Sequence, residues 1–146
     1  MRASNSTTRV KRRVAAAANR SRCNAASRMT SFRRNIEPAV RRELNAASLV
    51  QAPAAQFRHL ERAHVLGQQS TALHVLAHLR MARWAFHQKD MAELRGQLMR
   101  IIGAATKTVF GWVPTGNTGG ANVSPFKPLP IPDDLAAEIA AARRGR

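Results

Sequence analysis

Apolar and polar residues alternate with a helical period over residues 57–86, the longest such stretch of the chain. Gly67 predicts the end of a first helix, because glycine enters the left-handed backbone conformation with little strain. Ser70 predicts the start of a second helix, because its hydroxyl can cap the free amides of a first helical turn. We therefore expect two antiparallel helices joined by a short turn.

Three histidines fall on the apolar side of these two helices. On the second helix, at about 100° per residue, His74 and His78 share a face with Met81. On the first helix, His64 continues the apolar stripe and Glu61 lies beside it. Antiparallel helices bring together residues at equal distances from their turn, so we expect His64 to face His74 and Glu61 to face His78. The sequence thus predicts three imidazoles and one carboxylate along one buried seam.

Two further long helices are predicted, one on each side of this hairpin. The first begins near Asn35, which can act as an N-cap. The other begins at Asp90, where Glu93 follows three residues later in a capping-box-like pattern. Their predicted inward residues are Val40, Leu44 and Ala47 in the first helix, and Leu94, Leu98, Ile101, Ile102 and Ala105 in the other. We expect an all-α fold of four helices in two hairpins, similar to a pair of tetratricopeptide units.

Residues 111–146 have a different composition. Glycine and proline exclude long regular elements before residue 133, yet large apolar residues recur there: Trp112, Val113, Phe126, Leu129 and Ile131. This pattern predicts a Gly/Pro-rich strap that lies across the bundle. Asp133 and Asp134 then open a short terminal helix.

Residues 1–28 form a basic leader. They contain eight Arg or Lys residues and no acid, and they have no periodic apolar face, so we expect them to be disordered. Three origins fit this composition: an organellar transit peptide, a basic arm for nucleic acid, or an extension upstream of a true start at Met29. The expected units are therefore the leader, a helical bundle at 29–110, and the strap with its terminal helix at 111–146.

Charge and cysteine content narrow the class of protein. The formal net charge of the chain is +16, but outside the leader 16 basic and 8 acidic residues leave only +8. The single cysteine, Cys23, excludes an internal disulfide. An apolar run of about 18 residues, as a membrane-spanning helix needs, does not occur in the sequence. We expect a cytoplasmic protein.

Several short phrases resemble a small bacterial family of helical domains of unknown function. They are HLERAHVLGQ at 59–68, His74-x3-His78, GNTGGANVS at 116–124 and IPDDL at 131–135. The resemblance covers roughly residues 29 to 137. It implies a compact helical protein that begins just before the first helix, from a family that recurs beside heavy-metal resistance genes.

The histidine seam is the candidate chemistry of the chain. Two histidines four residues apart on a helix can reach one ion, and Glu61-x-x-His64 supplies a carboxylate and a third imidazole. Such ligands suit Zn, Cu, Ni or Fe, and Met81 as a further ligand would favour copper. We therefore predict an accessory metal-binding or haem-binding protein with Glu61, His64, His74 and His78 as ligands.

Two other functions compete with this one. The same four residues can form a structural His/Glu network inside a non-enzymatic helical interaction module with a protein partner. A basic nucleic-acid-binding protein is the third hypothesis, disfavoured because stacking aromatics and DNA-binding motifs are missing. Patterns for a catalytic nucleophile, a dinucleotide site or a P-loop are also missing, so the sequence favours a protein that is not an enzyme.

Overall fold

The computed structural model describes residues 4–107, 116–124 and 128–145. Within these ranges the fold is all-helical and contains no strand, which confirms the predicted fold class. The helices are α1 (Ser4–Leu49), α2 (Pro53–Gly67), α3 (Thr71–Gln88), α4 (Met91–Lys107) and α5 (Asp133–Arg144). None of these helices is long and apolar enough to cross a lipid bilayer.

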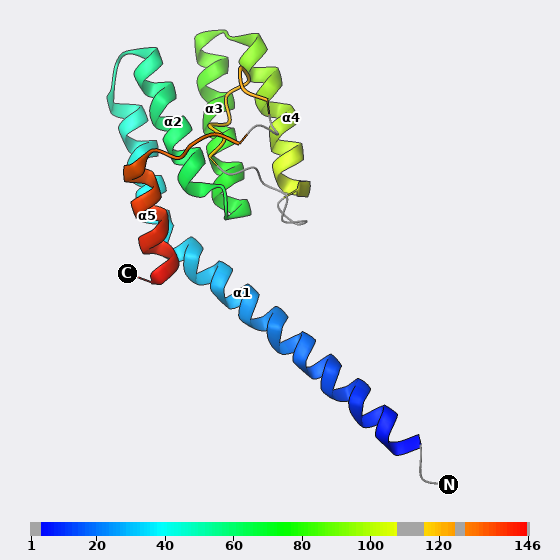
Figure 1. Ribbon diagram of the computed structural model, residues 1–146. Helices are drawn as coiled ribbons and strands as arrows, with labels where there is room; N and C mark the ends of the chain where they lie inside the picture. Colours follow the sequence, from blue (N-terminus) through cyan, green and yellow to red (C-terminus); the bar gives the residue numbers. More distant parts are fainter. Residues whose placement is uncertain (1–3, 108–115, 125–127, 146) are drawn as a thin grey trace.

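The helices form a layered bundle (Figure 1). α1 packs on α2, α2 on α3 and α3 on α4, while α5 lies against α1 and α2. The core contains residues of α1, α2, α3 and α5, among them Ile36, Val40, Leu66, Met81 and Leu135. A tetratricopeptide-like geometry of the helix pairs stays a prediction.

α4 packs differently from the other helices. Leu98 and Ile102, predicted to point inward, are 52% and 62% exposed. The buried side chains described on α4 are instead polar, Glu93 and Gln97, one helical turn apart. The predicted inward orientation is therefore wrong for Leu98 and Ile102, whereas Leu94 and Ile101 are half-buried and the side chain of Ala105 lies outside the described residues. Polar partners of a histidine occupy the positions that apolar residues would normally fill.

The turn between α2 and α3 lies where the sequence predicted it, but Gly67 has another role there. Its backbone is not left-handed, since the positive-φ glycines described are Gly116, Gly119 and Gly145. A Cβ added to Gly67 would lie 3.1 Å from Cβ of Leu73, so glycine lets the two helices approach closely. Ser70 is the N-cap of α3 by backbone conformation, without a side-chain capping hydrogen bond.

α1 is much longer than predicted and projects from the bundle (Figure 1). It begins at Ser4, so the predicted start near Asn35 is wrong, and it includes residues 4–28, for which the sequence predicted no regular structure. The described side chains from 11 to 31 are exposed, and the first buried one is Phe32. High helix propensity, as in the alanines at 15–18, continues the helix where no packing requires it.

Removal of residues 1–28 is expected to leave the melting temperature unchanged. A chain that begins at Met29 retains Phe32 and every described core residue after it, so no buried apolar area is lost. Thermal unfolding followed by circular dichroism tests this, with the full chain as control. A fall of more than about 4 °C, or about 1 kcal/mol for a domain of this size, would show that the leader is part of the cooperative fold.

The segment between α4 and α5 is described in part. Trp112, Val113 and Phe126, expected to fill gaps in the bundle, lie outside the described residues. Leu129 and Ile131 are half-buried, and Ile131 packs against the core. The strap as a whole, and a division of the chain at residue 110, stay predictions. The terminal helix is confirmed as α5.

Candidate metal site

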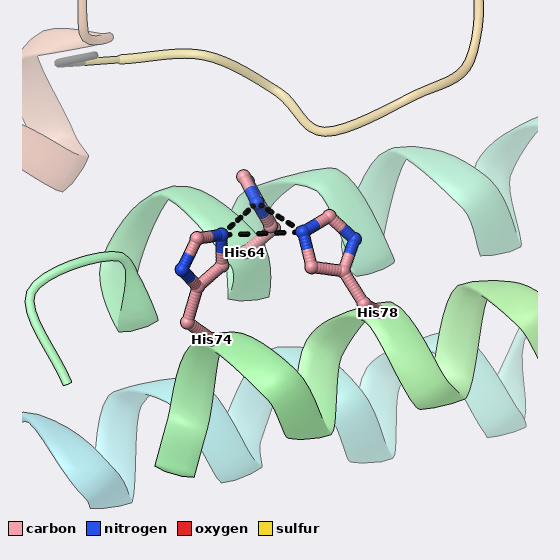
Figure 2. A group of neighbouring side chains, drawn as sticks. All are labelled: His64, His74 and His78. Carbon is pink, nitrogen blue, oxygen red and sulfur yellow. Dashed lines mark hydrogen bonds between the residues drawn. The ribbon is translucent and has the colours of Figure 1, made fainter. Parts of the chain in front are cut away.

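Three histidine side chains meet in the interior of the bundle (Figure 2). His64 comes from α2, and His74 and His78 come from successive turns of α3. The distances between their Nε2 atoms are 2.8 Å for His64 and His74, and 3.2 Å for each of the other two pairs. All three residues are buried, with exposed fractions of 2%, 7% and 2%. The predicted meeting of these histidines is confirmed, and together they could hold a metal ion.

The other ring nitrogen of His64 fixes the tautomer of this histidine. Nδ1 lies 2.9 Å from the backbone carbonyl of Asn117, which can only accept a hydrogen bond. Nδ1 therefore carries the proton, and Nε2 of the neutral ring presents a lone pair. The same carbonyl accepts a second hydrogen bond from Nε2 of Gln68 at 2.6 Å.

His78 is fixed in the same tautomer by Gln97. Its Nδ1 lies 2.6 Å from Oε1 of Gln97. The amide group of Gln97 donates to Oε1 of Glu93 at 2.5 Å and to the carbonyl of Gly119 at 2.8 Å, so its oxygen must face His78. Nδ1 of His78 is thus the donor, and its Nε2 also presents a lone pair to the centre.

His74 has a different environment. Its Nδ1 is buried and has no hydrogen-bond partner within the described part of the chain. If the ring proton of His74 is on Nε2, it can form a hydrogen bond in one of the three Nε2–Nε2 contacts, and the lone pair of Nδ1 then has no donor. If the proton is on Nδ1, three lone pairs face one another. No neutral tautomer therefore satisfies the cluster, whereas a cation at the centre would accept all three lone pairs.

The protonation of the cluster agrees with a ligand role. The pKa of His74 is lowered to about 3, the pKa of His78 is lowered to about 4, and the pKa of His64 is well below its usual value. Burial is the largest cause for all three. Mutual repulsion lowers the pKa of His64 and His74 further, and Arg100 acts in the same direction on all three. The imidazoles are hence neutral at pH 7, as metal ligands must be.

A glycine-containing segment covers the histidines. Gly119 has a φ of +85°, and a Cβ added to it would lie 2.9 Å from atoms of the His64 ring. The carbonyl of the next residue, Gly120, accepts a hydrogen bond from Arg100 at 2.9 Å. The backbone amide of Ala121 donates to Oε2 of Glu93 at 2.9 Å. Only a residue without a side chain can approach the ring so closely in this backbone conformation.

Glu61 and Met81, the other predicted ligands, do not join the group of three histidine nitrogens in the structure. Glu61 is half-buried near residues 118–120, and it is not part of the group whose ligand atoms lie within 4.8 Å of one another. Burial raises the pKa of Glu61, and the Thr118 side chain partly opposes the rise, although its hydroxyl approaches without full hydrogen-bond geometry. Met81 is fully buried in the hydrophobic core. Ligation by either residue stays a prediction.

The partners of the histidines were not predicted. Glu93 was expected to cap α4, and Asp90 does accept a hydrogen bond from the Glu93 amide, but the Glu93 side chain points inward. The spacing Glu93-x3-Gln97 repeats that of His74-x3-His78, a signal that two polar helix faces meet. No comparable pattern marks Asn117, which acts through its backbone.

These features define an all-helical protein with a buried cluster of three neutral histidines that could hold a metal ion. The chain belongs to the DUF3703 family, a protein family of unknown function, whose sequence profile matches residues 34–139. The family resemblance noted from the sequence is thereby confirmed. Searches of curated proteins and of solved structures returned no match for the chain.

Proposed function

We propose that the protein binds one transition-metal ion through Nε2 of His64, His74 and His78, as an accessory metal-binding protein. The observation that carries this proposal is the convergence of three Nε2 atoms, two of which are held as lone-pair donors by partners on Nδ1. Hydrogen bonds from Nδ1 to carbonyl or amide oxygens are typical of metal-bound histidines. The recurrence of the family beside heavy-metal resistance genes, which the sequence resemblance implies, fits the same chemistry.

The nitrogen separations suit a bare ion better than haem. An ion with metal–nitrogen bonds of about 2.0 to 2.1 Å in tetrahedral geometry holds its ligand nitrogens about 3.3 Å apart. The separations of 2.8 to 3.2 Å reach this value with shifts of a few tenths of an ångström. Two histidines on opposite sides of a haem iron would instead lie about 4 Å apart with the porphyrin between them.

A fourth ligand can come from the chain or from solvent. Glu61 lies one helical turn before His64, and a change of its side-chain rotamer is the shortest route to a carboxylate ligand. Its negative charge would also offset part of the charge of a divalent ion. Met81 is the alternative ligand within the chain, and its thioether would favour copper.

Protein purified without an affinity tag is expected to contain close to one equivalent of a transition metal by elemental analysis. After chelation, adding back the ion should raise the stability of the fold by about 2.7 kcal/mol at a hundredfold excess over Kd. Thermal melts with chelator and with Zn, Cu, Ni, Fe(II) or haem measure this gain. If no addition raises the midpoint above the chelated value, the metal-binding function is refuted.

A protein-interaction role is a second candidate, favoured by the exposed face of α4. Met91, Leu98 and Met99 are 57%, 52% and 70% exposed, an unusual apolar surface for a helix at the edge of a bundle. Under this hypothesis the histidines only organise the interior. The two roles are compatible, and the metal titration above decides the first of them independently.

A further inference from the structure

We propose that the site favours d10 ions, Zn(II) or Cu(I), and weakens the binding of Cu(II) and Ni(II) relative to the usual order of affinities. The inference rests on the proposed metal-binding function and specifies which ions it serves. It is carried by the spacing of the three Nε2 atoms, by the partners that hold two of the rings, and by the burial of the cluster beneath Gly119.

The spacing excludes a tetragonal arrangement of the three nitrogens. In a square-planar ion with bonds of about 2 Å, three ligands include one opposite pair about 4 Å apart. The largest separation in the cluster is 3.2 Å, and the three values differ by only 0.4 Å. The nitrogens therefore cap one face of an ion, as in tetrahedral coordination or on one face of an octahedron. Cu(II) and Ni(II) prefer tetragonal ligand sets, whereas d10 ions have no such electronic preference.

Two of the three rings cannot easily rearrange to suit another ion. His78 is held by Gln97, whose amide is itself fixed by Glu93 and Gly119. His64 is held by the Asn117 carbonyl, and its ring lies against the backbone of Gly119. An ion that needs these rings to move would break buried hydrogen bonds, and its affinity would fall accordingly.

Burial also disfavours octahedral coordination. An octahedral ion capped on one face by three imidazoles needs three more ligands, normally water. The three histidines are at least 93% buried, and the segment over His64 is so close that even a methyl group at Gly119 would clash. A site with one further position suits four-coordinate Zn(II), and a site with none suits three-coordinate Cu(I).

Charge distinguishes the two d10 ions. The three imidazoles are neutral, and the Arg100 guanidinium is close enough to act electrostatically on all of them. An anionic fourth ligand would therefore favour Zn(II), and Glu61, one helical turn before His64, is the candidate that we test. Cu(I) brings one charge and needs no fourth ligand. Replacing Glu61 by Gln should thus weaken Zn(II) binding at least about tenfold and change Cu(I) binding little.

The test is a set of competition titrations on the apo full-length chain. Zn(II), Co(II), Ni(II) and Cu(II) are each buffered by a competing chelator, and Cu(I) is titrated without oxygen against a chromogenic Cu(I) chelator. Zn(II) is expected to bind at least about a hundredfold more tightly than Ni(II), which reverses the usual Irving–Williams order of these two ions. The advantage of Cu(II) over Zn(II) is expected to shrink to less than about tenfold. Co(II) should show the intense visible bands of four-coordination.

The matched variant is Gln97→Met, which frees Nδ1 of His78 without changing the ligand set. In this variant the ratio of the Kd for Ni(II) to the Kd for Zn(II) should fall by about tenfold or more. His87→Gln changes an exposed histidine and should leave all affinities unchanged. Should Gln97→Met fail to fold by circular dichroism, the wild-type titrations decide alone.

Two results would overturn the inference, and they are distinguishable. Tight binding with Ni(II) above Zn(II), with Cu(II) more than about tenfold above Zn(II) and with weak octahedral Co(II) bands refutes the selectivity and leaves the metal-binding function intact. Failure to bind any of the five ions refutes both.

Discussion

Replacing His78 by alanine is expected to remove most of the metal-induced rise in stability while changing the apo protein far less. The variant loses one of three ligands, so Kd should rise by at least about a hundredfold, which removes about 2.7 kcal/mol of stabilisation at a fixed metal concentration. In the apo protein two effects oppose each other. Oε1 of Gln97 loses its donor, at about 1 to 3 kcal/mol, but the unfavourable contact between the His64 and His78 lone pairs disappears.

The comparison needs thermal melts of both proteins with chelator and with metal. His87→Ala is the matched control, because this histidine is exposed on the far side of α3, and it should retain the full metal effect. A structural network predicts the reverse order: metal adds nothing to the wild type, and the fall of the midpoint that His78→Ala causes in chelator exceeds any effect of metal. That result would leave the interaction module as the better hypothesis.

The meeting of the three histidines could be predicted because it depends only on local rules. A turn predicted at residues 67–69, and found at 68–70, suffices with a period of 3.6 residues to place His64 opposite His74. The same rule placed Glu61 opposite His78, but in the structure His64 lies between the two histidines of α3 and contacts both. The position of Glu61 beside residues 118–120 depends on a segment without periodicity, which the rule cannot place.

The role of α4 could not be predicted from apolar periodicity. That method assigns leucines and isoleucines to the interior, and here it failed for Leu98 and Ile102. Glu93 and Gln97 are buried because His78 and the backbone at residues 119–121 satisfy their polar atoms. The length of α1 was missed for a different reason, since helix propensity without a buried face gives no periodic signal.

The apo protein is expected to lose stability steeply as the pH falls below about 6.5. The unfolded histidines titrate near pH 6.5, whereas the folded pKa is about 3 for His74 and about 4 for His78, and that of His64 is also well below the usual value. Above pH 6.5 neither state binds these protons, so their contribution is constant. Between pH 6.5 and about 4 the histidines bind protons in the unfolded state and stay unprotonated in the folded state. Each histidine then lowers the free energy of unfolding by up to about 1.4 kcal/mol per pH unit.

A fall of two pH units below 6.5 lowers the free energy of unfolding by at most about 5 kcal/mol through His74 and His78 alone. This loss is comparable to the whole stability of many domains. Glu61 acts in the opposite sense, because a raised folded pKa favours the folded state as the pH falls. Urea unfolding with chelator from pH 7.5 to 4.5 measures the slope. The double variant His74→Leu/His78→Leu should have a much shallower slope, and His87→Gln the wild-type slope. Equal slopes in the wild type and the double variant would show that the two histidines are not held neutral in the fold, and the lone-pair argument for a metal site would then fail as well.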